Sequence, residues 1–167
     1  DVEIVCPECQ GKRFTQRVDF GRTLRGRPLF GENKTLRGFL VMVPACAVSF
    51  VLISWLLGPE GLWGLSPFGY AGLGAMAGFG FMAGELPNSM LKRQLDVAPG
   101  QAPEHPGLAK VCLMLDRTDS LLGALFMIWL LVELPLTVWL GCLLVGPGIH
   151  AIFSFMLYKF GVKGRAG

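Results

Sequence analysis

The stretch Gly38–Gly58, GFLVMVPACAVSFVLISWLLG, contains no charged residue. A helix needs about 20 apolar residues to cross about 30 Å of hydrocarbon, so this stretch predicts a membrane span that ends near Leu57. Residues 61–84 are also uncharged, and 120–158 carry only Glu133. The first of these regions fits one span and the second fits two. The sequence therefore predicts an all-α, polytopic transmembrane helix bundle with about four spans.

The basic residues predict how this bundle is oriented. All 15 Lys and Arg residues lie in 12–37, 92–117 or 159–165. The two turns predicted on the other side of the membrane, Gly58–Gly61 and Glu133–Pro135, contain none. Loops rich in Lys and Arg stay in the cytoplasm. We therefore expect a protein of the cell (inner) membrane in which both ends of this sequence lie on the cytoplasmic side. The net charge of +3 is too small to indicate nucleic-acid binding, and the basic residues flank spans instead of forming one solvated face.

The same pattern divides the chain into five segments. We expect a basic cytoplasmic N-terminal segment at 1–37, spans 1 and 2 in 38–84, a cytoplasmic active-site loop at 85–118, spans 3 and 4 in 119–160, and a cytoplasmic tail at 161–167. The second span is rich in glycine, and small residues allow helix backbones to approach closely in a membrane. We therefore expect the second span to lie inside the bundle.

A first polar cluster lies just before the first span, in Phe30–Gly38. Asn33, Lys34, Thr35 and Arg37 supply donors that suit a phosphate group. The alternative is that Lys34 and Arg37 are ordinary interfacial residues whose charged ends reach the water layer.

A second polar cluster, Gly84–Arg93, follows the second span and includes Asn88. If it is helical, Glu85, Ser89 and either Lys92 or Arg93 share one face at spacings of three or four residues. A carboxylate such as Glu85 at the membrane boundary is costly unless it is paired or bound to a cation. The alternative is that Glu85 simply points into water.

A third cluster, Asp116–Ser120, precedes the third span. Asp116 and Asp119 are three residues apart, so on a helix they lie on one face and can share a divalent cation. Mg²⁺ typically binds one or two carboxylates together with phosphate oxygens. The alternative is helix capping, because Asp is favoured near a helix start in its own right.

All three clusters resemble parts of a known family. The run Val18–Gly38, VDFGRTLRGRPLFGENKTLRG, and the run Gly84–Arg93, GELPNSMLKR, resemble the cytoplasmic loops of CDP-archaeol synthases, as do the later Asp116 and Asp119. The Ser-Lys-Arg and Asp-Arg-Thr-Asp elements also look like the distant phosphatidate cytidylyltransferases. The resemblance implies an enzyme, a nucleotidyltransferase that transfers a cytidylyl group from CTP to a lipid phosphate, releasing pyrophosphate with Mg²⁺ as cofactor.

The resemblance also implies roles for residues. Asp116 and Asp119 would hold the metal, and Lys34, Lys92 and Arg93 would contact phosphates. Catalysis would rest on Lys34, Lys92, Asp116 and Asp119, and the substrate and nucleotide site would add the following residues: Asn33, Thr35, Arg37, Glu85, Asn88, Ser89 and Arg93. Relatives have a further N-terminal span, which we expect to be missing here. A homodimer is left open, and the alternative function is a non-enzymatic membrane transporter or accessory subunit.

Overall fold

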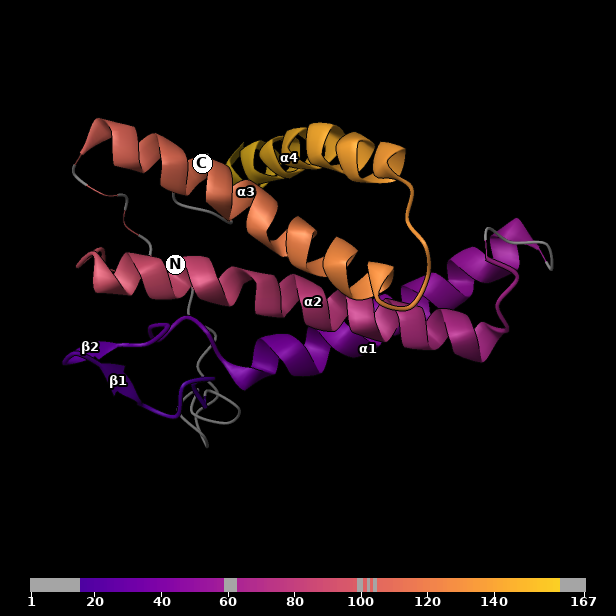
Figure 1. The fold of residues 1–167 in the computed structure, drawn as a ribbon, viewed down its shortest axis with the longest axis horizontal. Coiled ribbons are helices and arrows are strands. Elements are labelled where there is room, and N and C mark those ends of the chain that lie inside the picture. Colours follow the sequence, from indigo (N-terminus) through magenta and orange to yellow (C-terminus); the bar gives the residue numbers. More distant parts are fainter. Residues whose placement is uncertain (1–15, 59–62, 99–100, 102, 104, 160–167) are drawn as a thin grey trace.

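The computed structural model describes residues 16–58, 63–98, 101, 103 and 105–159. The predicted tail at 161–167 and most of the turn after the first span lie outside this part of the chain. Four helices and one short antiparallel hairpin make up the described residues (Figure 1). Their bounds are α1 Leu36–Leu57, α2 Pro67–Gln94, α3 Pro106–Trp129, α4 Leu136–Lys159, β1 Thr23–Leu24 and β2 Arg27–Pro28.

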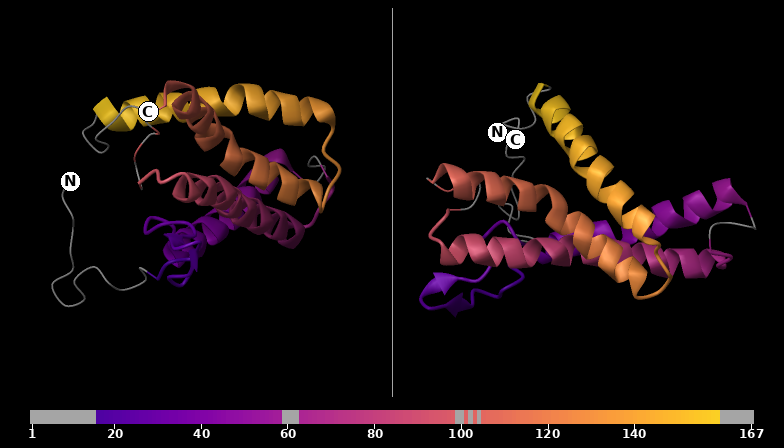
Figure 2. Two further views of the ribbon diagram at one scale, coloured as in Figure 1. Left: turned by 60° about the vertical axis from the view of Figure 1, so that its left-hand side comes forward. Right: turned by 45° about the horizontal axis from the view of Figure 1, so that its top comes forward.

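Helix α2 is the centre of the molecule. It packs extensively against α1 and against α3, whereas α4 contacts α3 over a smaller area. Figure 2 shows α4 diverging from the other three helices. The few fully buried apolar side chains include Tyr70, Leu73 and Ala77 of α2 and Leu125 of α3, so the core lies along both sides of α2.

Glycines allow α2 to approach both neighbours closely. A Cβ atom at Gly74 would lie 2.5 Å from the Cys46 carbonyl oxygen of α1, and one at Gly80 would lie 2.3 Å from the Gly123 carbonyl oxygen of α3. Such distances leave no room for a side chain, so backbone packs on backbone, as in other small-residue helix contacts in membranes. The prediction that the second span lies inside the bundle is consistent with this packing.

Helices α1 and α4 expose large apolar side chains, including Leu56 of α1 and Leu144 of α4. Among the described residues, two helices have the length and composition to cross a membrane: Leu36–Leu57 and Leu136–Phe153. The all-α prediction is confirmed at the level of a mostly helical chain. Spans formed by α2 and α3 stay a prediction.

Residues 85–118 are not one loop, contrary to our expectation. Helix α2 continues through Pro87 to Gln94, and α3 already begins at Pro106, so the connection is confined to 95–105. The apolar pattern indicates where the chain leaves the hydrocarbon of the membrane. A helix can continue beyond that point into water, as α2 does to Gln94. Polar residues expected on a loop therefore lie on two rigid helix ends.

The hairpin is held together by a buried carboxylate. Asp19, which is 4% exposed, accepts hydrogen bonds from the backbone N–H of Gly21 (2.9 Å) and of Phe30 (3.2 Å). The two turn residues Arg25 and Gly26 both have positive φ, as in the tight turns that suit the twist of a hairpin. This network fixes the path of the chain from β1 to the start of α1.

Candidate active site

Three segments far apart in the sequence meet through one chain of polar side chains. Lys34, two residues before α1, forms an ion pair with Glu85 of α2. The other Glu85 oxygen, Oε1, accepts a hydrogen bond of 2.9 Å from the hydroxyl of Ser120 on α3. These contacts join the segment after the hairpin to both α2 and α3.

Asn88 connects the two aspartates of α3. Its side-chain nitrogen Nδ2 donates to Asp116 Oδ1 at 2.6 Å and to Asp119 Oδ2 at 2.9 Å. Asn88 is 7% exposed and lies one helical turn after Glu85 on α2. The aspartates are three residues apart on α3 and face the same neighbour, as predicted.

Lys92 is the last residue of this series of polar contacts, at the end that is exposed to solvent. Its ammonium group pairs with both carboxylate oxygens of Asp116. The lysine side chain is 14% exposed, whereas the Asp116 side chain is 44% exposed. The site is therefore buried at Asn88 and opens to solvent near Asp116.

Oxygen ligands suited to a divalent cation are present at this site. Within the described residues, no three His, Cys, Asp or Glu side chains form a cluster that could hold a metal ion alone. Two carboxylates suffice for Mg²⁺ when phosphate oxygens and water complete the shell. The Asn88 oxygen Oδ1 is buried and accepts no hydrogen bond from a described residue. A turn of the Asn88 amide about its last side-chain bond would bring a further hard oxygen toward the carboxylates, so the residues present fit the ion.

The structure gathers six of the predicted site residues and leaves five others outside this chain of contacts. Those gathered are Lys34, Glu85, Asn88, Lys92, Asp116 and Asp119. Asn33 and Arg37 are exposed, and Thr35 is the N-cap of α1 without a side-chain capping bond. Ser89 is half-buried and makes no side-chain hydrogen bond with the described residues. Arg93 lies on a different side of α2, at a separate cavity.

Two structural residues of this region were absent from the predicted set. Ser120 bridges Glu85 and Asp119, with its hydroxyl 3.2 Å from Asp119 Oδ1. Its position four residues after Asp116 is the helical spacing that could have identified it. Asp19 holds the hairpin, and the Asp-x-Gly pattern at 19–21 is the turn signal that could have identified it.

Comparison with known proteins gives a consistent set of relatives. The family described as CarS-like, CDP-archaeol synthase, matches residues 13–165. A CDP-archaeol synthase of Methanoculleus marisnigri is 28% identical over 162 residues, covering 87% of this chain and 86% of its own. Those of Thermofilum pendens and Methanopyrus kandleri are 30% and 33% identical, covering 87% of this chain and 63% and 76% of their own lengths. No solved structure is significantly similar to this chain.

Proposed function

Because the chain belongs to the CDP-archaeol synthase family, we propose that it transfers the cytidylyl group of CTP to a lipid phosphate of the archaeol-phosphate type. The products are a CDP-lipid and pyrophosphate. The observation that carries the proposal is the single polar chain from Lys34 to Lys92, which brings two lysines and two aspartates from three segments together.

The reaction requires two polyanions to be held side by side. An oxygen of the lipid phosphate attacks the α-phosphorus of CTP, a new P–O–P bond forms, and the bond to the β-phosphate oxygen breaks. The protein mainly has to position the reactants and to stabilise charge. In the structure each lysine is neutralised by a carboxylate, Lys34 by Glu85 and Lys92 by Asp116. Incoming phosphates compete for these cations.

Mg²⁺ is the cofactor that we propose for this site. Asp116 and Asp119 would hold the ion, with Asn88 beside them. When bound, Mg²⁺ neutralises the charge that develops on the phosphate oxygens. Lys34 and Lys92 contribute positive charge on either side of the two aspartates, so the chain's own cations and the metal act on the same phosphate groups.

We further propose that all four helices cross the membrane and that the site faces the cytoplasm. Helices α1 and α4 present apolar side chains outward, as a lipid-facing surface requires. Gly74 and Gly78 of α2 contact α1, and Gly80 and Gly84 contact α3, which explains the lower overall apolarity of this helix. The site lies at the basic end of the helices, which the positive-inside rule assigns to the cytoplasm. A membrane-embedded lipid can then present its phosphate from the side.

The test uses two preparations of CTP, one labelled at the α-phosphate and the other at the γ-phosphate. Purified protein in detergent or vesicles is incubated with Mg²⁺ and with unsaturated ether-linked archaeol phosphate or ester-linked phosphatidate. α-³²P-CTP should label the lipid, whereas γ-³²P-CTP should label only pyrophosphate. Transfer of the γ-label to lipid would indicate a kinase instead.

The same preparation also tests the alternative functions. If no lipid phosphate acquires the α-label, the proposal is wrong. Solute flux across vesicles in the absence of labelling would favour a transporter. A side-by-side comparison of the ether-linked and ester-linked phosphates identifies the preferred lipid.

A further inference from the structure

Asn88 is the most deeply buried residue of the candidate site, and half of its amide has no partner. The residue is 7% exposed. Its Nδ2 atom donates to both aspartates of α3, whereas its Oδ1 atom is buried and accepts no hydrogen bond from a described residue. A buried acceptor without a donor is costly. The contacts between α2 and α3 therefore use the nitrogen of this amide and leave its oxygen without a use.

Neither orientation of the Asn88 amide satisfies every polar atom around it. Ionised carboxylates only accept hydrogen bonds, so the nitrogen faces Asp116 and Asp119, and Oδ1 is left without a donor. The reverse orientation would place three oxygens together, Oδ1 and one from each aspartate. Such a group of oxygens is repulsive unless a positive charge lies between them. A cation is the species that makes the reverse orientation favourable.

The two aspartates each direct one oxygen toward the same point. Asp116 Oδ1 lies 2.6 Å and Asp119 Oδ2 lies 2.9 Å from Asn88 Nδ2. The other Asp119 oxygen, Oδ1, is held within α3, where it accepts from the backbone N–H of Ser120 at 2.6 Å and lies 3.2 Å from the Ser120 hydroxyl. Helix α3 thus fixes which Asp119 oxygen faces Asn88. Convergence of oxygens from separate carboxylates on one point suits a small divalent cation.

Asp119 has no ionic partner among the described residues. The two lysines of the site are engaged elsewhere, Lys34 with Glu85 and Lys92 with Asp116. The Asp119 side chain is half-buried, so water compensates its charge only in part. The two lysines therefore leave the negative charge of Asp119 without a matching positive charge.

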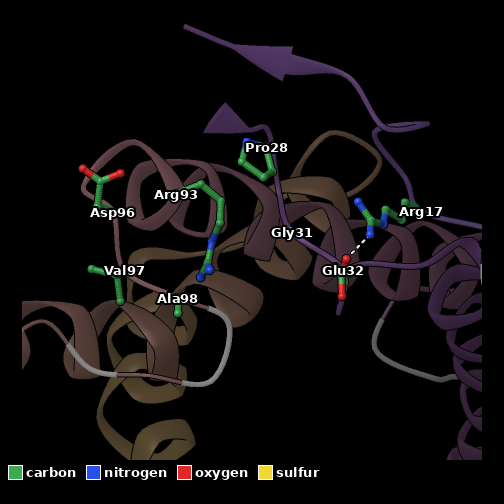
Figure 3. Close-up of a pocket in the computed structure, with 8 residues that line it drawn as sticks. All are labelled: Arg17, Pro28, Gly31, Glu32, Arg93, Asp96, Val97 and Ala98. Atoms are coloured by element: carbon green, nitrogen blue, oxygen red, sulfur yellow. Dashed lines mark hydrogen bonds and ion pairs between the residues drawn. The ribbon is translucent and has the colours of Figure 1, made fainter. Parts of the chain in front are cut away.

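Arg93 does not supply that charge either. It lines a separate cavity of about 350 Å³, where Arg27 holds the hairpin over the end of α2. Figure 3 shows the Arg93 guanidinium directed toward Ala98 and away from Glu32. The unmatched charge of Asp119 and the unused oxygen of Asn88 therefore lie together, and both call for a cation.

We infer that Asn88 is a third protein ligand of the divalent cation, and that its amide turns when the cation binds, so that Oδ1 joins Asp116 and Asp119. The inference rests on the proposed function, which assigns the ion to the two aspartates. Amide carbonyl oxygens suit Mg²⁺ and Mn²⁺ as carboxylates do. A neutral third ligand adds affinity for the cation without adding negative charge that would repel phosphate groups.

Mn²⁺ binding to the purified protein, without CTP or lipid, tests the inference. Mn²⁺ takes the same oxygen ligands as Mg²⁺, and electron paramagnetic resonance measures the free ion. Asn88→Leu removes the oxygen at similar volume and should weaken Mn²⁺ binding at least about tenfold, since loss of even an outer partner of a metal site costs about that much. Asn88→Asp should tighten binding by about tenfold, because a charged ligand raises affinity.

Thr118→Val is the matched control on α3. The Thr118 hydroxyl bonds only to carbonyl oxygens of its own helix, those of Met114 and Leu115. This variant also replaces a polar side chain by an apolar one of similar size, so its Mn²⁺ affinity should equal that of the wild type. An equal loss in Thr118→Val and Asn88→Leu would overturn the inference, because the loss would then not depend on the amide oxygen.

Thermal unfolding separates a ligand from a residue that only ties α2 to α3. If Asn88 is only a tie, Asn88→Asp replaces its two N–H donors by a third carboxylate and lowers the unfolding temperature equally with and without Mn²⁺. If Asn88 is a ligand, the same variant is destabilised without a divalent cation and gains more from added Mn²⁺ than the wild type does. The first pattern, or unchanged Mn²⁺ affinity in both Asn88 variants, would overturn the inference, as would a wild type that binds no Mn²⁺.

Kinetics distinguish failure of this inference from failure of the proposed function. For Asn88→Asp we expect a lower Mg²⁺ concentration at half-maximal rate together with a raised KM for CTP, because the added charge repels the triphosphate. A wild-type chain that makes no CDP-lipid refutes the proposed function. Normal synthesis by the wild type, with Mn²⁺ affinity unchanged in both variants, refutes only the role of Asn88.

Discussion

Substitution of Gly123 by alanine should disrupt the candidate site without touching any of its side chains. A Cβ atom at Gly123 would lie 2.1 Å from the Gly80 carbonyl oxygen and 2.8 Å from Gly84 Cα. The first distance is 1.3 Å short of 3.4 Å, where ordinary contact begins. Both opposing atoms belong to the backbone of α2, so no side chain can move aside. The two helices must separate or rotate.

The consequence for the site follows from its hydrogen bonds. Asn88 of α2 lies 2.6 Å from Asp116 and 2.9 Å from Asp119 of α3, and a further 1 Å would take both contacts beyond hydrogen-bonding distance. A displacement of about 1 Å can cost about 100-fold in rate. Overpacking costs about 1–3 kcal/mol, partly offset by the better helix propensity of alanine, which is about 1 kcal/mol.

The assay is the initial rate of α-³²P-CTP incorporation into lipid, together with thermal unfolding in detergent. Gly72→Ala is the matched control, since a Cβ atom at Gly72 of the same bundle meets nothing within 4 Å. It should keep the wild-type rate and equal or slightly exceed the wild-type unfolding temperature. If Gly123→Ala is as active as Gly72→Ala, the spacing of α2 and α3 does not determine the geometry of the site.

Three further outcomes follow from the same contacts. Asp116→Asn and Asp119→Asn should each lower the rate by at least about 100-fold, because a proposed metal ligand loses its charge; circular dichroism checks that the fold is kept, and full activity in both would remove them from the site. Lys34→Gln should raise the KM for CTP, measured from initial rates, and should lower the unfolding temperature, because Glu85 loses its ionic partner. The double variant Lys34→Gln with Glu85→Gln should recover the unfolding temperature but keep the raised KM. Chelation with EDTA should abolish labelling and added Mg²⁺ should restore it, and activity that survives chelation would exclude the proposed cofactor.

The sequence predicted the helices well where apolar composition determines them. The first predicted span ends at Leu57, as α1 does. The thickness of the membrane hydrocarbon sets the length of an uncharged helical segment, so this end can be read from the sequence. The end of the second helix was not predictable in this way. Composition changes at Glu85, but helical hydrogen bonding continues to Gln94, and Pro87 is accommodated within it.

The candidate site was partly predictable for a different reason. Asp116 and Asp119 lie on one face because of helical spacing, which can be read from the sequence. The contact of Asn88 with both depends on how closely α2 and α3 approach at Gly84 and Gly123, and this tertiary distance has no local signal. For Arg93 the family resemblance implied a phosphate contact, but its cavity exists only because the hairpin folds back over α2.

The central position of α2 also restricts how this chain can vary in length. Side chains that contact α1, α3 and the hairpin follow one another on a single uninterrupted helix. The direction in which each side chain points from the helix axis depends only on its position in the sequence. One residue inserted between Gly84 and Glu85 would turn everything after it by about 100°, moving Asn88 away from the aspartates and Arg93 out of its cavity at the same time. Substitutions can be absorbed locally on such a helix, whereas insertions and deletions between Gly84 and Gln94 cannot.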